Sequence, residues 1–410
     1  MADHSFWLPT SQESSAHHRH QASLDGVRDF SAPSLSAAEQ AQQAQAVISS
    51  LFNHCEPVQS STPYKKVTLV RLTYEQCRSA DLFLQLFFIY FDGFKFCCSS
   101  GDTAIQPSFN QGLARCAGFS SQSPAAQKQE VESVIDSFAE YLFNNFFLPM
   151  KAAGSKTPQA SAASLSAPTI DNVVGTPARL SVLRRDCLTR DHHRCVVTHQ
   201  FDVTEAIKRG DRDPEPKDDD DRPLAGPLAR LEVAHIIPHS IMSSKTTDGR
   251  PELSASKRTA LSILNMFDPG VIHLIEGSNI DRPSNAISLA SDLHTCFGLF
   301  KLTFEPIGSA ISTDHTYTIN SSNALVRSSY NLPVTRELLL SPNCTINPPS
   351  VKLLVLHCSI AHILELSTVG AYIDRIIWDM EEVWVRSDGS AELGRIVGLK
   401  LGGWLDGMAA

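Results

Sequence analysis

The sequence predicts an α+β protein in which one small strand–strand–helix unit is flanked by mainly helical N- and C-terminal regions. Residues 231–239 form a short run of apolar and β-branched residues that ends near a proline, which indicates a strand. Residues 285–289 indicate a second short strand, and Ser291 with Asp292 then supplies a helix start. Outside this unit, apolar residues recur at helical spacing over 127–150 and enrich 350–366.

The N-terminal third predicts a separate helical domain. Residues 1–32 are polar and rich in His, and we expect a disordered tail there. Residues 33–151 follow as the helical domain, which could bind a protein partner because it has its own apolar helices. The elements expected inside it are a helix over 34–55, a strand over 64–72, a helix over 80–90, a loop-rich stretch over 99–123 and an amphipathic helix over 127–150.

Composition marks a domain boundary after this region. Residues 152–177 are rich in Ala, Ser, Thr and Pro, which predicts a linker. The strand–strand–helix module is expected over 178–306 and a helical extension over 307–410. Further expected elements are helices over 177–191, 253–267, 350–366 and 371–385, a strand over 316–319, and a weak strand or tail over 396–405.

Composition also limits the class of protein. The chain of 410 residues is 42% hydrophobic, which is enough for real cores, and its ten cysteines are scattered without a C-x-x-C pair. The start of the chain is polar, and the richest apolar run, 82–91, is short for a membrane span and contains Gln85. These features predict an intracellular protein of cytoplasm or nucleus, with no signal peptide, transmembrane segment or membrane partner.

Three polar residues lie on the central unit in a chemically suggestive order. His235 ends the first expected strand, Asn285 begins the second, and His294 lies in the first turn of the helix. A neutral imidazole can take a proton from water or hold a divalent cation. Each residue alone has an ordinary structural explanation, such as a turn Asn or a hydrogen-bonded His, so only the three together predict a functional site.

This order, with eight residues between Asn285 and His294, resembles the HNH endonuclease family of the type common in fungi. The stretch 185–198 resembles the segment that precedes the nuclease motif in that family, so the resemblance covers about 178–306. It implies a ββα-metal (His-Me finger) fold and cleavage of DNA. It also implies one divalent ion, with Mg²⁺ or Mn²⁺ favoured and Zn²⁺ as an alternative. In the family's terms His235 is the general base, Asn285 orients it, and His294 helps to hold the metal.

The sequence departs from the family pattern at two positions. Ala234 stands where many members have Asp before the base, and Gly298 stands where many have His or Asp four residues after the last His. Glu232, on the same strand face as Ala234, and His239 are candidate substitute metal ligands, although a solvated strand residue and an ordinary loop His are the simpler alternatives. The absence of C-x-x-C predicts no structural zinc. An inactive HNH-fold scaffold that binds nucleic acid or protein is therefore the alternative function.

The charge of the chain allows a local DNA-binding surface. The net charge of −9 speaks against a large nonspecific DNA-binding surface but not against a local one. Arg185, Arg190 and Arg194 are candidate phosphate contacts, with pairing to Asp186 and Asp191 as the alternative. The acidic stretch 211–222 is expected to be a solvated insertion.

Overall fold

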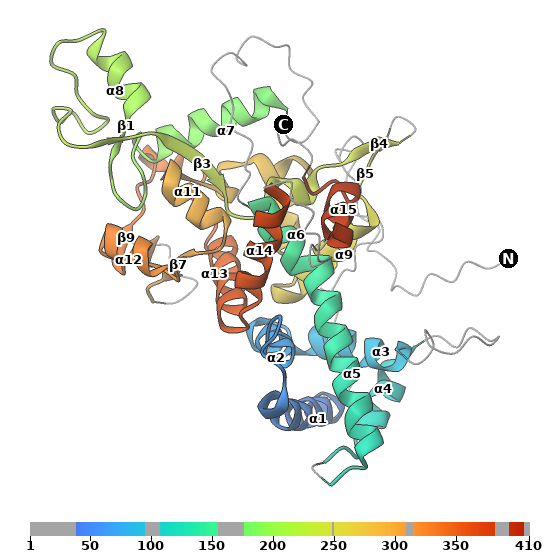
Figure 1. The fold of residues 1–410 in the computed structure, drawn as a ribbon. Helices are drawn as coiled ribbons and strands as arrows, with labels where there is room; N and C mark the ends of the chain where they lie inside the picture. Colours follow the sequence, from blue (N-terminus) through green and yellow to red (C-terminus); the bar gives the residue numbers. More distant parts are fainter. Residues whose placement is uncertain are drawn as a thin grey trace.

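The structure is a computed structural model that describes residues 38–94, 107–120, 122–154, 176–247, 250–308, 315–381 and 393–405. The tail 1–32 and most of the predicted linker therefore lie outside the described residues. In Figure 1 the N-terminal helices gather at the lower end, and α5 rises from them toward the centre, where α6 lies beside the C-terminal helix α14. The mixture of helices and small sheets confirms the α+β class.

The N-terminal region is helical, as predicted, but one expected strand is wrong. Residues 66–72 form most of α2 instead, and this helix is buried on several sides, with Val67, Leu69 and Val70 all in the core. Packing thus overrides the β-branched composition. Part of the expected loop 99–123 is α4, which Ser108 caps by accepting a hydrogen bond from the backbone of Gln111. The helices here are α1 (Ala38–Cys55), α2 (Lys66–Gln76), α3 (Ala80–Gly93), α4 (Phe109–Cys116) and α5 (Ala125–Leu142).

The start of the predicted linker is buried helix. A π-helical turn, Phe143–Phe147, joins α5 to α6 (Leu148–Gly154), and every residue of α6 is buried. The Lys151 ammonium donates to the carbonyl of Gly370 at 2.9 Å and pairs with Asp374 at 2.9 Å, both in α14 (Val369–Glu381). The linker prediction is therefore wrong for residues 152–154, whose small side chains serve packing.

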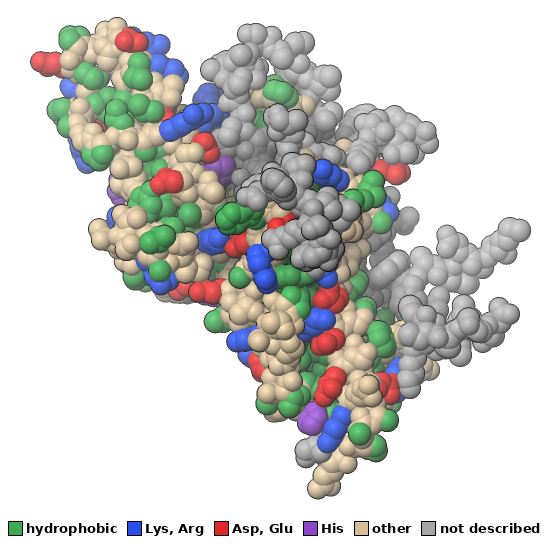
Figure 2. Space-filling model, in the orientation of Figure 1, with side chains coloured by type: hydrophobic (Ala, Val, Ile, Leu, Met, Phe, Trp, Pro, Cys, Tyr) green, Lys and Arg blue, Asp and Glu red, His purple; other side chains and the backbone are tan. Residues whose placement is uncertain are grey.

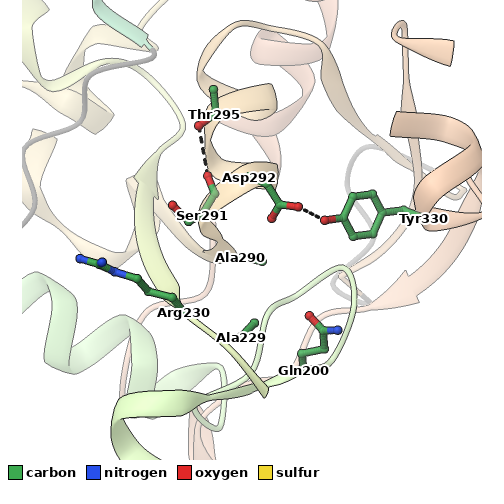
Figure 3. A pocket seen from close by; sticks show the side chains of 8 residues that line it. All are labelled: Gln200, Ala229, Arg230, Ala290, Ser291, Asp292, Thr295 and Tyr330. Atoms are coloured by element: carbon green, nitrogen blue, oxygen red, sulfur yellow. Dashed lines mark hydrogen bonds between the residues drawn. The ribbon is translucent and has the colours of Figure 1, made fainter. Parts of the chain in front are cut away.

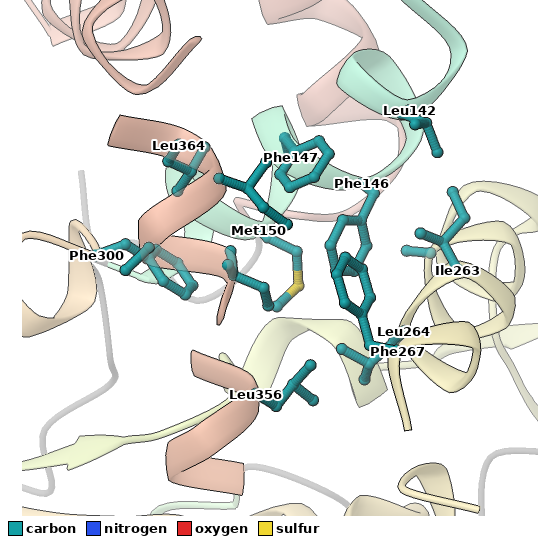
Figure 4. Close-up of a cluster of buried hydrophobic side chains, with 14 of the residues drawn as sticks. Leu142, Phe146, Phe147, Met150, Ile263, Leu264, Phe267, Phe300, Leu356 and Leu364 are labelled. Carbon is teal, nitrogen blue, oxygen red and sulfur yellow. The ribbon is translucent and has the colours of Figure 1, made fainter. Parts of the chain in front are cut away.

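The hydrophobic core is shared between regions that the sequence assigned to different domains. Figure 4 shows Phe146, Phe147 and Met150, from the π-helical turn and α6, among side chains from later in the chain. Phe146 stacks on Phe267 of α9 (Ala255–Phe267) with ring centroids 5.5 Å apart. Leu356 and Leu364 of α13 (Val351–Leu366) complete this part of the core. One continuous apolar cluster thus joins the N-terminal, central and C-terminal parts.

The contact between α6 and α11 (Ser291–Gly298) gives a first testable expectation. A Cβ on Gly154 would lie 2.1 Å from the carbonyl oxygen of Gly298, so Gly154→Ala must push two buried helices apart. We expect a loss of about 1–3 kcal/mol of stability, as for overpacked cores. Gly210→Ala is the matched control, because Gly210 also ends a helix, α8 (Val203–Gly210), and has open space around it. Equal urea-unfolding midpoints for the two variants would contradict this.

The predicted strand–strand–helix unit is present. Strands β3 (Leu231–His235) and β6 (Ala286–Ala290) pair antiparallel, with His235 opposite Ala286 and Leu231 opposite Ala290. Helix α11 follows β6 without a loop and packs on β3. The elements between the two strands are β4 (Lys245–Thr247), β5 (Arg250–Glu252), α9, α10 (Ile272–Ile275) and 3-10 turns at His239–Met242, Gly277–Asp281 and Pro283–Asn285.

The acidic stretch 211–222 is not simply a solvated insertion. Asp218 is buried and pairs with Arg194 at 2.6 Å. Asp219 lies 2.8 Å from His193 and 2.7 Å from Arg209. Although burial opposes it, the hydrogen bonds from these two residues lower the pKa of Asp219 to about 2. The acids therefore fasten this loop to α8 and to the turn after α7 (Pro177–Arg190). The short strands β1 (Phe201–Asp202) and β2 (Leu228–Ala229) pair parallel to each other.

The C-terminal region adds a small sheet and, among the described residues, four α-helices. Strands β7 (Leu302–Pro306), β8 (Thr316–Ser321) and β9 (Val334–Glu337) form an antiparallel sheet in that order, which confirms the strand predicted over 316–319. The segment 396–405 was expected as a weak strand or tail, but most of it belongs to α15 (Leu393–Leu401). The remaining helices are α12 (Ala324–Tyr330), α13 and α14. Among the described residues, no single helix has the length and hydropathy needed to cross a membrane. Helices α13 and α14 have them only when taken together, and the two are bent against each other by 89°.

Candidate functional site

Glu232 on β3 holds His294 on α11. The Nδ1 of His294 lies 2.6 Å from one carboxylate oxygen of Glu232, and the hydroxyl of Ser291 donates to the other at 2.9 Å. The hydrogen bond with His294 is the main reason why the pKa of Glu232 is lowered. The Nε2 of His294 is buried and has no hydrogen-bond partner among the described residues. If Nδ1 carries the proton, Nε2 presents a lone pair, which is the arrangement of a metal-binding His backed by a carboxylate.

This geometry changes the role expected for Glu232. The 2.6 Å separation is that of a hydrogen bond, and both carboxylate oxygens are engaged by protein groups. In this arrangement Glu232 orients His294, and its role as a second metal ligand stays a prediction. The residues therefore fit a divalent cation through one imidazole nitrogen, with the remaining positions filled by water or substrate oxygens.

His235 forms a second imidazole–carboxylate pair. Its Nε2 lies 3.2 Å from Asp281, its side chain is only 1% exposed, and its Nδ1 has no hydrogen-bond partner among the described residues. Donation from Nε2–H to Asp281 would leave the Nδ1 lone pair able to accept a proton. Sequence reasoning missed Asp281 as a site residue. The available signal was an acidic residue four positions before Asn285.

His239 joins the same carboxylate. Its Nδ1 lies 3.4 Å from Asp281, and its ring centroid lies 5.8 Å from that of His235. Burial, helped by the proximity of His235, lowers the pKa of His239 to about 4, so the ring is neutral near pH 7. The structure thus groups His239 with His235 and Asp281, and not with His294 and Glu232.

Asn285 fixes the backbone around His235. Its side-chain oxygen accepts from the amide of Ile237 at 3.0 Å, and its nitrogen donates to the carbonyls of Ile237 and Ile280 at 3.1 and 3.0 Å. These bonds tie the segment after β3 to the turn that ends at Asp281. Asn285 therefore positions both members of the His235–Asp281 pair through the backbone.

The two pairs approach the β3–β6 ribbon from different sides. Side chains alternate along a strand, so Glu232 points toward α11, whereas Val233 packs with Leu183 and Cys187 of α7. His235 has the same parity as Val233 and lies about 10 Å of strand beyond Glu232. That His235 and His294 serve one metal ion therefore stays a prediction.

At the two positions where many family members have a metal-ligand side chain, this sequence has small residues that pack in the core. Ala234 is 1% exposed and belongs to the apolar core. Gly298 is buried, and its carbonyl lies against Gly154 of α6. Neither position supplies a side-chain ligand, and the helix that covers Gly298 comes from the N-terminal region.

Residues 195–305 match the family described as HNH endonuclease, and the match spans β3, Asn285, β6 and α11. These residues form an HNH domain. The domain occupies just over a quarter of the chain and indicates a nuclease-type hydrolase function with nucleic-acid binding. No curated protein and no solved structure matches the chain.

The HNH domain has a hollow at the start of α11. Ser291 and Asp292 lie at its edge, with Arg230 from the segment between β2 and β3 and Tyr330 from α12 (Figure 3). Ser291 connects this hollow to the Glu232–His294 pair by its hydrogen bond. Asp292 accepts a hydrogen bond from Tyr330. The hollow therefore carries one basic and one acidic side chain near the buried pair.

Two of the three predicted phosphate contacts have structural roles. Arg190 is fully buried and paired with Asp191, so it is not available to a phosphate, and this prediction is wrong. Arg194 pairs with Asp218 and lies over the ring of Phe201 at 5.4 Å. Arg185 has a 70% exposed side chain and pairs only locally with Asp186. Over the lower helical half of the face drawn in Figure 2, basic and acidic side chains lie interspersed.

Proposed function

We propose that the chain is a metal-dependent DNA endonuclease whose chemistry lies in the HNH domain. The observation that carries this proposal is the pair of imidazoles, His235 and His294. Each is held on one nitrogen by a carboxylate and is buried with its other nitrogen free of protein hydrogen bonds among the described residues. Such buried, oriented imidazoles suit proton transfer and cation binding.

Each pair would have its own task. His235 would accept a proton from the attacking water at Nδ1, and Asp281 would stabilise the imidazolium that results. Asn285 would keep that pair aligned through the backbone. His294, supported by Glu232, would hold the cation, which supplies charge stabilisation to the phosphate when bound.

DNA as the substrate follows from the family resemblance. Arg185 on α7, before the HNH match, and Arg230 at the hollow beside α11 are both exposed, and either suits a backbone phosphate. With a net charge of −9, binding should depend on few such contacts and weaken as salt rises. Cleavage of DNA by the full chain with Mg²⁺, Mn²⁺ or Zn²⁺ is the direct test.

The supporting role of Glu232 gives a sharper experiment. Glu232→Gln removes the charge that orients His294, so the concentration of metal needed for half-maximal cleavage should rise about 10- to 100-fold. Excess metal should restore most of the rate. Glu276→Gln is the matched control, because Glu276 also pairs with a His, at 3.2 Å, but that His273 is exposed and outside the motif. An unchanged metal requirement in Glu232→Gln would remove His294 from the metal site.

A non-catalytic HNH scaffold is the second candidate. It is favoured by the core position of Ala234, by the α6 backbone that covers Gly298, and by the 1% exposure of the His235 side chain. Wild-type protein that binds DNA but cleaves it with none of the three ions would support the scaffold and overturn the endonuclease.

A further inference from the structure

Three potential ligands from distant parts of the chain meet where β7 crosses α13. The Glu305 carboxylate lies 3.3 Å from the Nε2 of His362, and the Cys358 sulfur lies 3.9 Å from the same nitrogen. The ligand atoms of the three residues all lie within 4.8 Å of one another. Among the described residues, this is the one group of three or more His, Cys, Asp or Glu side chains whose ligand atoms lie this close together.

The fold brings these residues together. Cys358 and His362 are four residues apart on α13, so they share one face of that helix. Strand β7 packs on α13 and carries Glu305 near its end. Glu305 is the last residue of the HNH match, whereas both α13 residues lie beyond it, so the group is not part of the His–Asn–His pattern.

The spacing is close to that of a zinc site. Tetrahedral Zn²⁺ with bonds of about 2.3 Å to sulfur and about 2.0–2.1 Å to nitrogen and oxygen separates N and O by about 3.3 Å, and S and N by about 3.6 Å. The first separation equals the one between Glu305 and His362, and the second is only slightly shorter than the one between Cys358 and His362. Small side-chain movements would complete the site.

We propose that Glu305, Cys358 and His362 bind one thiophilic divalent cation, Zn²⁺ by preference, with water in the fourth position. A thiolate ligand favours zinc over the hard cations Mg²⁺ and Ca²⁺. His362 and Glu305 are 40% and 47% exposed in their side chains, which gives the ion a path from solvent. A bound ion would fasten the last strand of the HNH match to the C-terminal helices.

The alternative is an ordinary surface ion pair beside a buried thiol. Burial raises the pKa of Cys358 to about 12, and the charge of Glu305 adds to this, so the thiol alone is protonated and unreactive at neutral pH. A cation bound there must displace the thiol proton. An experiment that detects thiolate–metal bonding therefore separates the two possibilities.

Titration of the metal-free full chain with Co²⁺ tests the proposal. We expect one equivalent to give thiolate-to-cobalt charge-transfer absorption and tetrahedral visible bands, which Zn²⁺ then abolishes by displacement. Cys358→Ser should remove the charge-transfer band, and Glu305→Gln and His362→Gln should weaken binding by at least about 10-fold. The last two variants change exposed side chains, so they remain informative if Cys358→Ser does not fold.

Cys296→Ser and His273→Gln are the matched controls. Cys296 is a partly buried cysteine on α11, two residues after His294, and His273 is an exposed, carboxylate-paired His. Both should leave the cobalt spectrum unchanged. A charge-transfer band that survives Cys358→Ser, or one that is lost in Cys296→Ser, would overturn the proposal. So would the absence of any band in the wild type, whatever the result for DNA cleavage.

Discussion

Replacing His235 should lower the rate of DNA cleavage by about 10²- to 10⁴-fold, because the variant loses the group that takes the proton from water. Affinity for DNA should change little, because it comes mainly from phosphate contacts elsewhere. His235 is buried against the Asp281 carboxylate, so truncation to alanine would also leave that charge without its imidazole. His235→Gln is the better variant, because its amide can still donate to Asp281 while it cannot accept a proton at neutral pH.

The measurement is single-turnover cleavage at saturating metal, with DNA affinity and thermal unfolding recorded on the same samples. His273→Gln is the control for loss of a carboxylate-paired His outside the motif, and it should cleave at the wild-type rate. Asp281→Asn should act in the same direction as His235→Gln, because a neutral amide cannot stabilise the imidazolium. Wild-type cleavage by a folded His235→Gln protein would place the chemistry elsewhere in the chain.

The elements that carry these residues could be predicted because their signals are local. A β-branched run ending near Pro238 indicates β3, and Ser291 with Asp292 marks the start of α11. The partner of His235 could not be predicted in the same way. Asp281 lies 46 residues from His235, and only the folded turn before Asn285 brings the two side chains together. The sequence motif therefore indicates which imidazoles matter but not which carboxylates hold them.

Two predictions from composition were wrong because the same composition occurs in two kinds of structure. Ala152, Ala153 and Gly154 have the small side chains of a linker, but small side chains also allow close packing of helices, and α6 uses them against α11. The acidic run 218–221 has the composition of a solvated loop. Two of its acids, Asp218 and Asp219, instead pair with Arg194 and with His193 and Arg209, which are 10 to 26 residues away from the acids that they pair with. Neither outcome has a signal within the segment itself.

Arg190→Met should cost about 3–5 kcal/mol of folding stability. The side chain is fully buried and holds both oxygens of Asp191 at 2.7 and 2.9 Å. It also donates to the carbonyls of Pro283 and Ala286, at 2.7 and 2.9 Å. Methionine would fill much of the volume but would leave the buried Asp191 carboxylate without its cationic partner and these carbonyls without the guanidinium donor.

Arg185→Met is a close control, because Arg185 also pairs with the acid that follows it in the sequence, but on the surface of α7. Exposed pairs contribute little, so this variant should stay within about 0.5 kcal/mol of the wild type. Urea unfolding of both variants measures the difference, and similar midpoints would show that Arg190 is not needed in the fold.

The loss of Arg190 should also affect the candidate site. Because Pro283 and Ala286 flank Asn285, loss of Arg190 should loosen the turn that aligns Asp281 with His235, and residual cleavage should fall even where the variant remains folded.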